Sequence, residues 1–183
     1  MKALVTGGAG FIGSNLVKFL CDRGHKVTVI DDLSAGFLAL VDKRCKFYRG
    51  SITNVKLLDQ VLPGNDVVFH LAATATITYS VKNPKVYFRN NFMKGIVLLE
   101  GMRRAGVRKI IYSSSGAGYG QPDKVVVDEN TPIQPINPYG ASKVAFEHAL
   151  SAYYHSFGIE SVSLRYFNVY GPRDEQKFST RAL

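Results

Sequence analysis

The sequence predicts an α/β domain built on a doubly wound parallel β-sheet. Three observations point to this fold class: short apolar runs alternate with longer amphipathic runs, the connections are short, and a glycine-rich loop follows the first apolar run. The 183 residues suffice for one domain with a buried core, so we expect a single domain over 1–183. The expected strand order is 3-2-1-4-5-6.

The expected elements alternate between strands and helices along the chain. Period-2 and continuous apolar runs place the strands at 3–6, 26–30, 45–48, 66–70, 109–113 and 161–165. Apolar residues three and four apart place the helices at 14–23, 53–61, 84–105 and 138–157. The first helix is expected to bury Leu16, Val17, Phe19 and Leu20. Glycine and proline over 116–137 predict a long loop at the carboxyl edge of the sheet.

The composition excludes several classes of protein. Apolar residues at 46% and charged residues at 20% are typical of a globular domain in water. No apolar run approaches the roughly 20 residues that span a bilayer, and no signal peptide is recognisable, so no membrane association is expected. Cys21 and Cys45 lack metal-ligand spacing, which argues against a metal site and a disulfide framework. We therefore expect a cytoplasmic protein without a metal.

The net charge of +9 raises the question of nucleic-acid binding. The densest group of basic residues in the chain comprises Arg103, Arg104, Arg108 and Lys109, and the other basic residues are scattered along the sequence. A nucleic-acid footprint would form a contiguous stripe, so no nucleic-acid partner is expected. A mild positive field also suits an anionic small substrate.

The loop after the first strand carries the strongest local motif. Its sequence is Gly7-Gly8-Ala9-Gly10-Phe11-Ile12-Gly13, which fits both G-x-G-x-x-G and G-x-x-G-x-x-G. Glycines there permit a tight turn, close approach of a pyrophosphate to the backbone, and close packing of the helix on the strand. The amides at the start of the next helix then face the phosphates. The alternative is a purely structural glycine turn.

An acidic residue directly after the second strand specifies the dinucleotide. Asp31 lies near the roughly 20-residue spacing expected for the carboxylate that binds a ribose 2′-hydroxyl. A carboxylate there repels a 2′-phosphate, which favours NAD over NADP. Asp32 is adjacent and is alternatively a cap of the following turn.

Tyr139 and Lys143 form a candidate catalytic pair. They are four residues apart and therefore share one face of the helix that begins at Pro138. A tyrosine hydroxyl has a pKa of about 10, and a nearby ammonium group favours its deprotonated form. Tyr139 is thus a candidate general acid/base, although such a pair alone also occurs on helix surfaces.

At this point the sequence resembles the extended short-chain dehydrogenase/reductase family, specifically its NAD-dependent nucleotide-sugar epimerases and dehydratases, which share a Rossmann-type fold. The resemblance runs nearly end to end. It rests on 6–13 (TGGAGFIG), 70–73 (HLAA), the serines before Tyr119-Gly120, 138–143 (PYGASK) and 165–173 (RYFNVYGPR).

The resemblance implies roles for individual residues. Tyr139 would be the acid/base, Lys143 would hold the nicotinamide ribose and lower the pKa of Tyr139, and Ser115 would bind the reacting hydroxyl. Ser115 is chosen over Ser113 and Ser114 because it lies four residues before Tyr119. The cofactor-binding residues would be Gly7, Gly10, Phe11, Ile12, Gly13, Asp31, Asp32, Ser51, Ile52, Leu71, Ala72, Ala73, Tyr139 and Lys143. The substrate would meet Ser115, Tyr139 and Asn168. Asn91 would either support the site or be an ordinary polar helix residue.

Two departures from the family pattern stand out. Ser51 replaces the aspartate that commonly meets the adenine amino group, although Ser51 can still make one hydrogen bond. Lys94-Gly95 replaces the usual Gly-Thr of the long helix, and the sequence alone offers no account of this change.

The residues after Ser115 indicate the reaction type. Dehydratases of the family place an acidic pair there, and the decarboxylating relatives commonly keep a glutamate, whereas this chain has Gly116-Ala117. The neutral pair resembles the 4-epimerases, so we expect a nucleotide-sugar 4-epimerase, with a UDP-sugar favoured as substrate. The alternatives are a dehydratase or decarboxylase of the family and a non-catalytic NAD-binding module.

The resemblance also implies a longer protein. Family members continue beyond this length into a smaller C-terminal substrate lobe, so the chain is expected to be truncated and to have little or no activity alone. Family members also pair two long helices, which here implies a homodimer through 84–105 and 138–157.

Overall fold

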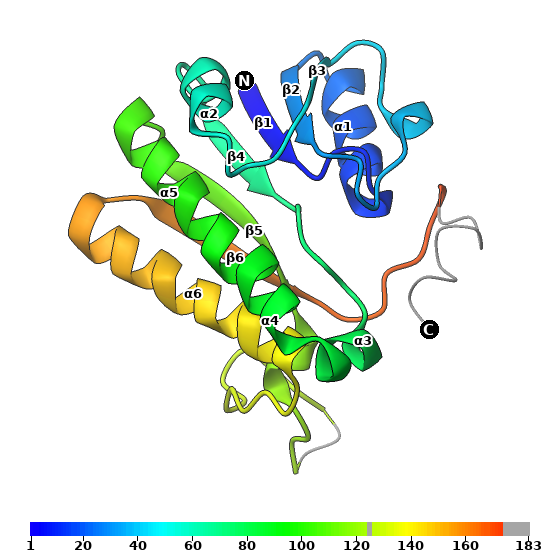
Figure 1. The fold of residues 1–183 in the computed structure, drawn as a ribbon, viewed down its shortest axis with the longest axis vertical. Helices are drawn as coiled ribbons and strands as arrows, with labels where there is room; N and C mark the ends of the chain where they lie inside the picture. Colours follow the sequence, from blue (N-terminus) through cyan, green and yellow to red (C-terminus); the bar gives the residue numbers. More distant parts are fainter. Residues whose placement is uncertain (124–125, 174–183) are drawn as a thin grey trace.

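The computed structural model describes residues 1–123 and 126–173. Its centre is a six-stranded parallel sheet in the order β3-β2-β1-β4-β5-β6 (Figure 1). This order reverses between β1 and β4, as in a doubly wound fold, and confirms the predicted fold class. The strands are β1 (Lys2–Thr6), β2 (Lys26–Asp31), β3 (Lys46–Arg49), β4 (Val67–His70), β5 (Lys109–Ser115) and β6 (Glu160–Tyr166).

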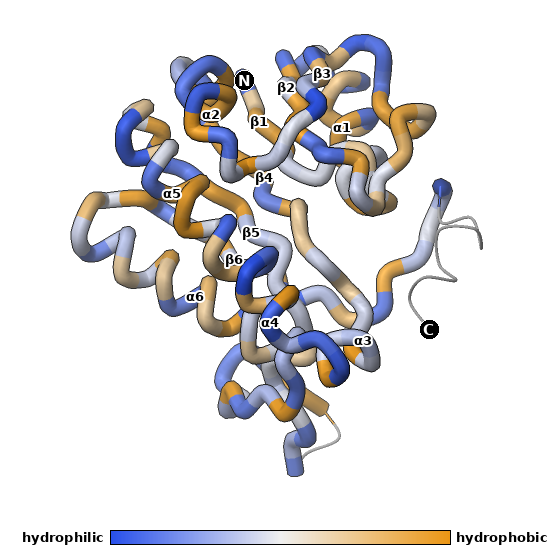
Figure 2. The backbone as a smooth tube through the Cα atoms, viewed as in Figure 1, coloured by the Kyte–Doolittle hydropathy of each residue, from blue (hydrophilic) through white to orange (hydrophobic). Residues whose placement is uncertain are grey.

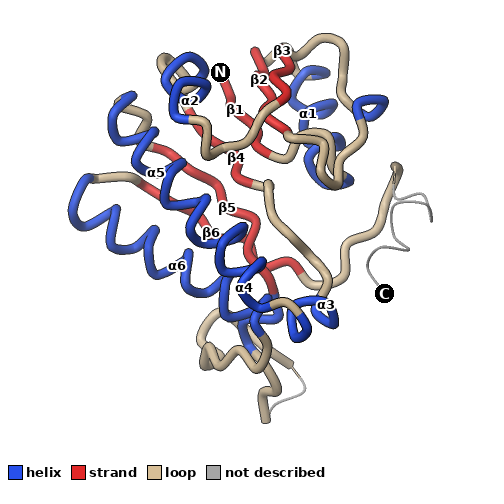
Figure 3. Tube along the Cα trace, in the orientation of Figure 1, coloured by secondary structure: helices blue, strands red, loops and turns tan. Residues whose placement is uncertain are grey.

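Helices cover both faces of the sheet. They are α1 (Phe11–Asp22), α2 (Val55–Val61), α3 (Ile77–Lys82), α4 (Pro84–Tyr87), α5 (Lys94–Ala105) and α6 (Pro138–Phe157). Hydrophobic and hydrophilic stretches alternate along α5 and α6, as expected for helices that bury one side (Figure 2). The helix α1 packs on β1–β3, whereas α2, α5 and α6 lie on the opposite face (Figure 3). In the described ranges no helix is long and apolar enough to cross a membrane.

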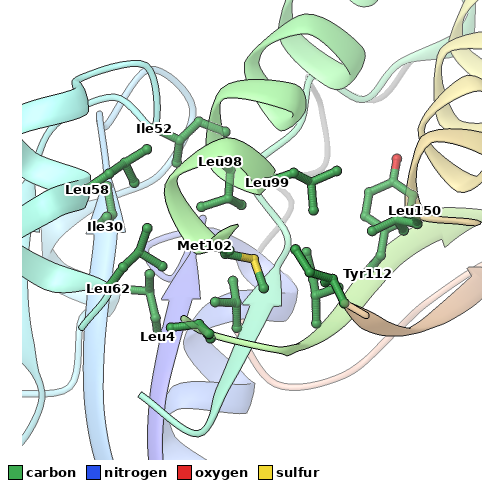
Figure 4. Close-up of a cluster of buried hydrophobic side chains, with 14 of the residues drawn as sticks. Leu4, Ile30, Ile52, Leu58, Leu62, Leu98, Leu99, Met102, Tyr112 and Leu150 are labelled. Atoms are coloured by element: carbon green, nitrogen blue, oxygen red, sulfur yellow. The ribbon is translucent and has the colours of Figure 1, made fainter. Parts of the chain in front are cut away.

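Two hydrophobic clusters hold these layers together. The larger cluster joins α2, α5 and α6 to the sheet, with Leu58, Leu98 and Leu150 fully enclosed (Figure 4). The smaller cluster packs Val17 and Leu20 of α1 against the other face. Burial of such side chains contributes about 1.5–3 kcal/mol each, so the clusters fix the strand ends that carry the site.

Three local expectations need correction. Phe19 does not face inward: it is 50% exposed, and the Arg23 guanidinium lies 3.4 Å from its ring centroid. Residues 84–105 do not form one α-helix, because a π-helical turn at Phe88–Met93 separates α4 from α5. The first helix begins at Phe11 rather than at residue 14, and the short helix α3 lies in a segment to which no element was assigned.

The edge strand β6 has an unusual distribution of side chains. Its partly buried Arg165 pairs with Glu147 of α6, so alternation along the strand puts Ser161 and Ser163 on that same side. Val162 and Leu164 point to the other side of the sheet, where both are exposed. The described residues therefore leave an apolar strip of the sheet uncovered beside β6.

Candidate dinucleotide and active site

A cleft of about 750 Å³ opens at the carboxyl ends of the strands. It lies where the strand order reverses, the place at which open α/β sheets bind ligands. Four loops line it, those that follow β1, β2, β3 and β4, together with Asn90 and Lys94. Ten predicted cofactor residues are among its lining: Gly7, Gly10, Phe11, Asp31, Asp32, Ser51, Ile52, Leu71, Ala72 and Ala73.

The glycine loop fits a dinucleotide because side chains are excluded from it. Gly7 has φ +74°, and a Cβ atom there would lie 2.6 Å from the Ala72 amide nitrogen. A Cβ atom at Gly13 would overlap the Gly7 carbonyl oxygen. Gly10 caps α1, and the Ser14 amide donates to its carbonyl oxygen at 2.9 Å. The three amides before Ser14 precede the first helical hydrogen bond, so they can bind phosphate oxygens.

Asp31 is buried where β2 ends and braces this loop. One carboxylate oxygen accepts from the Ala9 amide at 3.0 Å, and the other accepts from the Leu33 amide at 2.8 Å. Each oxygen keeps a lone pair, so Asp31 can still accept from ribose hydroxyls. A structural role and a cofactor role are therefore compatible at this position.

Asp32 is more exposed and accepts from the Ser34 amide at 2.9 Å, as a turn cap would. Partial burial opposes its ionisation, but hydrogen bonds from Ser34 and the positive charge of Lys94 lower the pKa of Asp32. Two carboxylates, one buried and one exposed, thus follow β2 in the cleft.

The departure at Ser51 is visible in the cleft wall. The Ser51 hydroxyl lies 2.9 Å from the Thr53 hydroxyl and forms a local turn with it. Ile52, next to it, is buried in the large core cluster. At Ser51 the cleft therefore offers an engaged hydroxyl in place of the carboxylate expected from the family resemblance.

The predicted catalytic residues meet beside this cleft, at the end of β5. Asn137 caps α6 by accepting from the Gly140 amide at 2.8 Å, which places Tyr139 in the first helical turn. The Ser115 side chain accepts from the Ala117 amide at 3.2 Å and lies close enough to Tyr139 to favour deprotonation of its hydroxyl. One turn further on, the Lys143 ammonium nitrogen donates to the Ser113 carbonyl oxygen at 2.8 Å and lies 5.9 Å from the Tyr139 ring centroid.

Burial dominates the protonation of this group. It raises the pKa of Tyr139, with the Ser115 hydrogen bond acting in the opposite direction. It also lowers the pKa of Lys143 from 10.5 to about 7. The raised pKa of Tyr139 is opposite to the expected direction, because the effect of burial outweighs that of the neighbouring Ser115.

The serine run divides its contacts among three partners. Ser113 meets Lys143 through its carbonyl, the Ser114 hydroxyl donates to Glu147, and Ser115 meets Tyr139. The count back from Tyr119 thus selected the serine that contacts the tyrosine.

Asn91 links the two halves of the site, an arrangement that sequence patterns did not establish. Its side chain accepts from the Thr74 amide at 2.7 Å and donates to the Thr74 carbonyl oxygen at 3.0 Å and to the Ser142 hydroxyl at 3.1 Å. Asn91 lies within the π-helical turn and is buried. It therefore joins the loop after β4 to the helix that carries Tyr139 and Lys143.

The predicted site residues and the residues that line the cleft differ in part. Ile12, Gly13, Tyr139 and Lys143 lie outside its described lining, and Asn168 is exposed just after β6. Thr74, Asn90 and Lys94 line the cleft but were not predicted, since nothing in their spacing marks them. The described residues hold no group of three or more histidine, cysteine, aspartate or glutamate side chains suited to a metal.

The comparisons with known proteins agree with this geometry. At the sequence level, a UDP-glucose 4-epimerase of Streptomyces lividans is 43% identical over 173 residues, which is 93% of this chain and 53% of that protein. A UDP-glucose 4-epimerase of Streptococcus mutans is 42% identical over 96% of this chain and 54% of its own length. The chain therefore spans about half the length of these curated relatives.

Solved structures give the same picture. The UDP-glucose 4-epimerase of Thermus thermophilus, in complex with NAD, has a TM-score of 0.90 at 43% identity, over 96% of this chain and 58% of that one. A dTDP-glucose 4,6-dehydratase from Streptomyces venezuelae, with NAD and DAU bound, has a TM-score of 0.90 at 32% identity, over 97% and 59% of the two chains. The sequence model of the NAD dependent epimerase/dehydratase family matches residues 3–183 of this chain. With a match over nearly its whole length, the chain belongs to the NAD-dependent epimerase/dehydratase family.

Proposed function

We propose that this chain is the NAD-binding part of a nucleotide-sugar 4-epimerase, with UDP-glucose and UDP-galactose as its substrates. The observation that carries the proposal is the approach of Ser115 to Tyr139, one turn before Lys143 on the same helix, beside a cleft with a glycine loop and Asp31. The UDP-glucose 4-epimerases among the relatives support the choice of substrate. NAD would be held by the loop 7–13, by Asp31 and by the segments 51–52 and 71–73.

The residues of this chain have separate tasks in such a reaction. Bound NAD would supply the hydride acceptor and donor for the sugar C4 carbon. Tyr139 would take the proton of the C4 hydroxyl and give it back, because its hydroxyl is a general acid/base once deprotonated. Ser115 would orient the same hydroxyl. Lys143, when charged, would favour the phenolate form of Tyr139 and hold the nicotinamide ribose.

The two residues after Ser115 favour epimerisation over dehydration. A 4,6-dehydratase must remove a proton at C5 and expel the C6 hydroxyl, and neither Gly116 nor Ala117 can transfer a proton. A Cβ atom at Gly116 would lie 2.8 Å from the Phe167 ring, so glycine also allows this close packing. The dehydratase and decarboxylase readings therefore require a proton-transfer group from elsewhere.

The direct test is turnover by the full-length protein supplied with UDP-galactose or UDP-glucose. Formation of the other hexose with no change in mass supports a 4-epimerase. A product lighter by 18 mass units would instead identify a dehydratase, and loss of carbon dioxide from a UDP-uronate would identify a decarboxylase.

The second candidate class is a non-catalytic NAD-binding module. The contacts of Ser115, Tyr139 and Lys143 argue against it, since a module needs none of them to hold NAD. Tyr139→Phe removes the acid/base but keeps the ring, so it should abolish turnover and preserve NAD binding. Unchanged biological function of this variant would favour the module.

A homodimer through the helices near 84–105 and 138–157 belongs to the same proposal. Phe88, Met93, Tyr154 and Phe157 of these segments are exposed and available for such pairing. Light scattering of the full-length protein at micromolar concentration tests this, and a monomer mass would contradict it.

A further inference from the structure

Lys94 gives the cleft a positive charge that the family pattern does not contain. Among the described residues that line the cleft, it is the one cationic side chain. It is the first residue of α5, directly after the π-helical turn, and is partly buried. A charged side chain at this position can contact a ligand bound in the cleft.

The core packing fixes where Lys94 lies along the cleft. Leu98 is four residues further along α5, so the two residues share one face of the helix. Leu98 belongs to the same buried cluster as Ile52, which lies near it (Figure 4). Lys94 therefore extends this face toward the adenine end of the cleft, where Ser51 and Ile52 form the wall.

A second neighbour is on the loop after β2. The charge of Lys94 acts on Asp32, which lines the same cleft. No salt bridge within 4.0 Å joins them, and among residues 1–123 and 126–173 no hydrogen bond engages the Lys94 ammonium group. Its three donors thus remain available to a ligand.

The neighbouring Gly95 explains how Lys94 is accommodated. A Cβ atom at Gly95 would overlap the ring of Phe146, a core residue of α6. The glycine lets α5 pack closely on that ring, and the lysine before it takes the side facing the cleft. The Lys-Gly pair thus has two separate tasks, one in packing and one in the cleft.

We propose that Lys94 is a further cofactor-binding residue, which donates a hydrogen bond to the adenosine half of the dinucleotide. This inference rests on the proposed NAD binding. Asp31 and Asp32 are acceptors suited to the ribose hydroxyls, and Ser51 lacks the carboxylate that would accept from the adenine amino group. The Lys94 ammonium group would instead donate to acceptor atoms of adenine or its ribose. This chain would thus recognise adenosine through a hydrogen-bond donor, where the family commonly uses an acceptor.

Calorimetric titration of the nucleotide-free, full-length protein tests the proposal with three probes: NAD, ADP-ribose and nicotinamide mononucleotide. Lys94→Met should weaken NAD and ADP-ribose about tenfold, which is typical of one charge-assisted hydrogen bond. It should leave nicotinamide mononucleotide unchanged, because that probe lacks adenosine. Lys94→Arg keeps the charge and should bind NAD within about threefold of the wild type.

Lys56→Met is the matched control, since Lys56 is exposed on α2 and outside the cleft lining. Melting of each ligand-free variant checks folding, and Lys94→Gln replaces Lys94→Met if the latter does not fold. Unchanged NAD binding by the Lys94 variant, or equal weakening of all three probes, overturns the role of Lys94 alone. Failure of NAD to bind the wild type overturns the proposed function itself.

Discussion

Replacing Lys143 with methionine should make the nucleotide-free protein more stable while removing its activity. Lys143 is 2% exposed, and burial lowers its pKa from 10.5 to about 7. At about 1.4 kcal/mol per pH unit, that difference amounts to about 5 kcal/mol of destabilisation when the side chain is charged. Methionine removes the charge and fills a similar volume. It also leaves the Ser113 carbonyl without its donor, which costs about 1–3 kcal/mol. A net gain of roughly 2–4 kcal/mol remains where the wild-type side chain is charged.

The stability difference between Lys143→Met and the wild type should depend on pH. Between pH 7 and 10.5 the unfolded chain binds a proton at Lys143 that the folded chain does not, so wild-type stability rises with pH in this window. The advantage of Lys143→Met should therefore be largest below pH 7 and should reverse before pH 10.5, where only the cost of the lost Ser113 hydrogen bond remains.

Urea denaturation followed by circular dichroism, from pH 6 to pH 10, measures this difference. Lys56→Met, at an exposed site, should show no comparable gain. The reasoning is refuted if Lys143→Met is less stable than the wild type at pH 6, or if the gap between them does not change with pH.

Three further perturbations follow from the site. Gly13→Ala should weaken NAD binding at least tenfold in fluorescence titration, because the new methyl group overlaps the Gly7 carbonyl oxygen; binding equal to wild type would contradict the close packing of this loop. Asn91→Leu should lower the free energy of unfolding by about 2–4 kcal/mol and reduce kcat, since the buried Asn91 side chain loses three hydrogen bonds to Thr74 and Ser142. A loss of kcat with unchanged stability would show a direct role in the reaction. Ser51→Asp should tighten NAD by a few-fold, about 1 kcal/mol, in equilibrium dialysis, since a carboxylate can accept from the adenine amino group. Weaker binding would mean that the charges of Asp31 and Asp32 outweigh that bond.

The sequence predicted those parts of the molecule that local patterns determine. The strand order and the glycine loop follow from short runs of residues, and the helix at 138–157 has the predicted bounds. The π-helical turn was missed, because it depends on contacts of Asn91 with residues far away in the chain. The low pKa of Lys143 was not predicted either, because it results from burial of the side chain, which the spacing of residues in the sequence does not reveal.

The position of Lys94 was missed for a related reason. A substitution within a helix can be read from a sequence, but the direction of its side chain depends on how the helix packs. Here the packing of Gly95 on Phe146 and of Leu98 in the core decides that direction.

The open side of β6 has a practical consequence for any measurement on this chain. Val162 and Leu164 are exposed there, and within residues 1–123 and 126–173 β6 is an edge strand of the sheet. A second copy of the chain on this strip would bind the folded state alone and raise its apparent stability by mass action. A melting temperature that rises with chain concentration would reveal such association, whereas cover from the same polypeptide would leave the melting temperature independent of concentration.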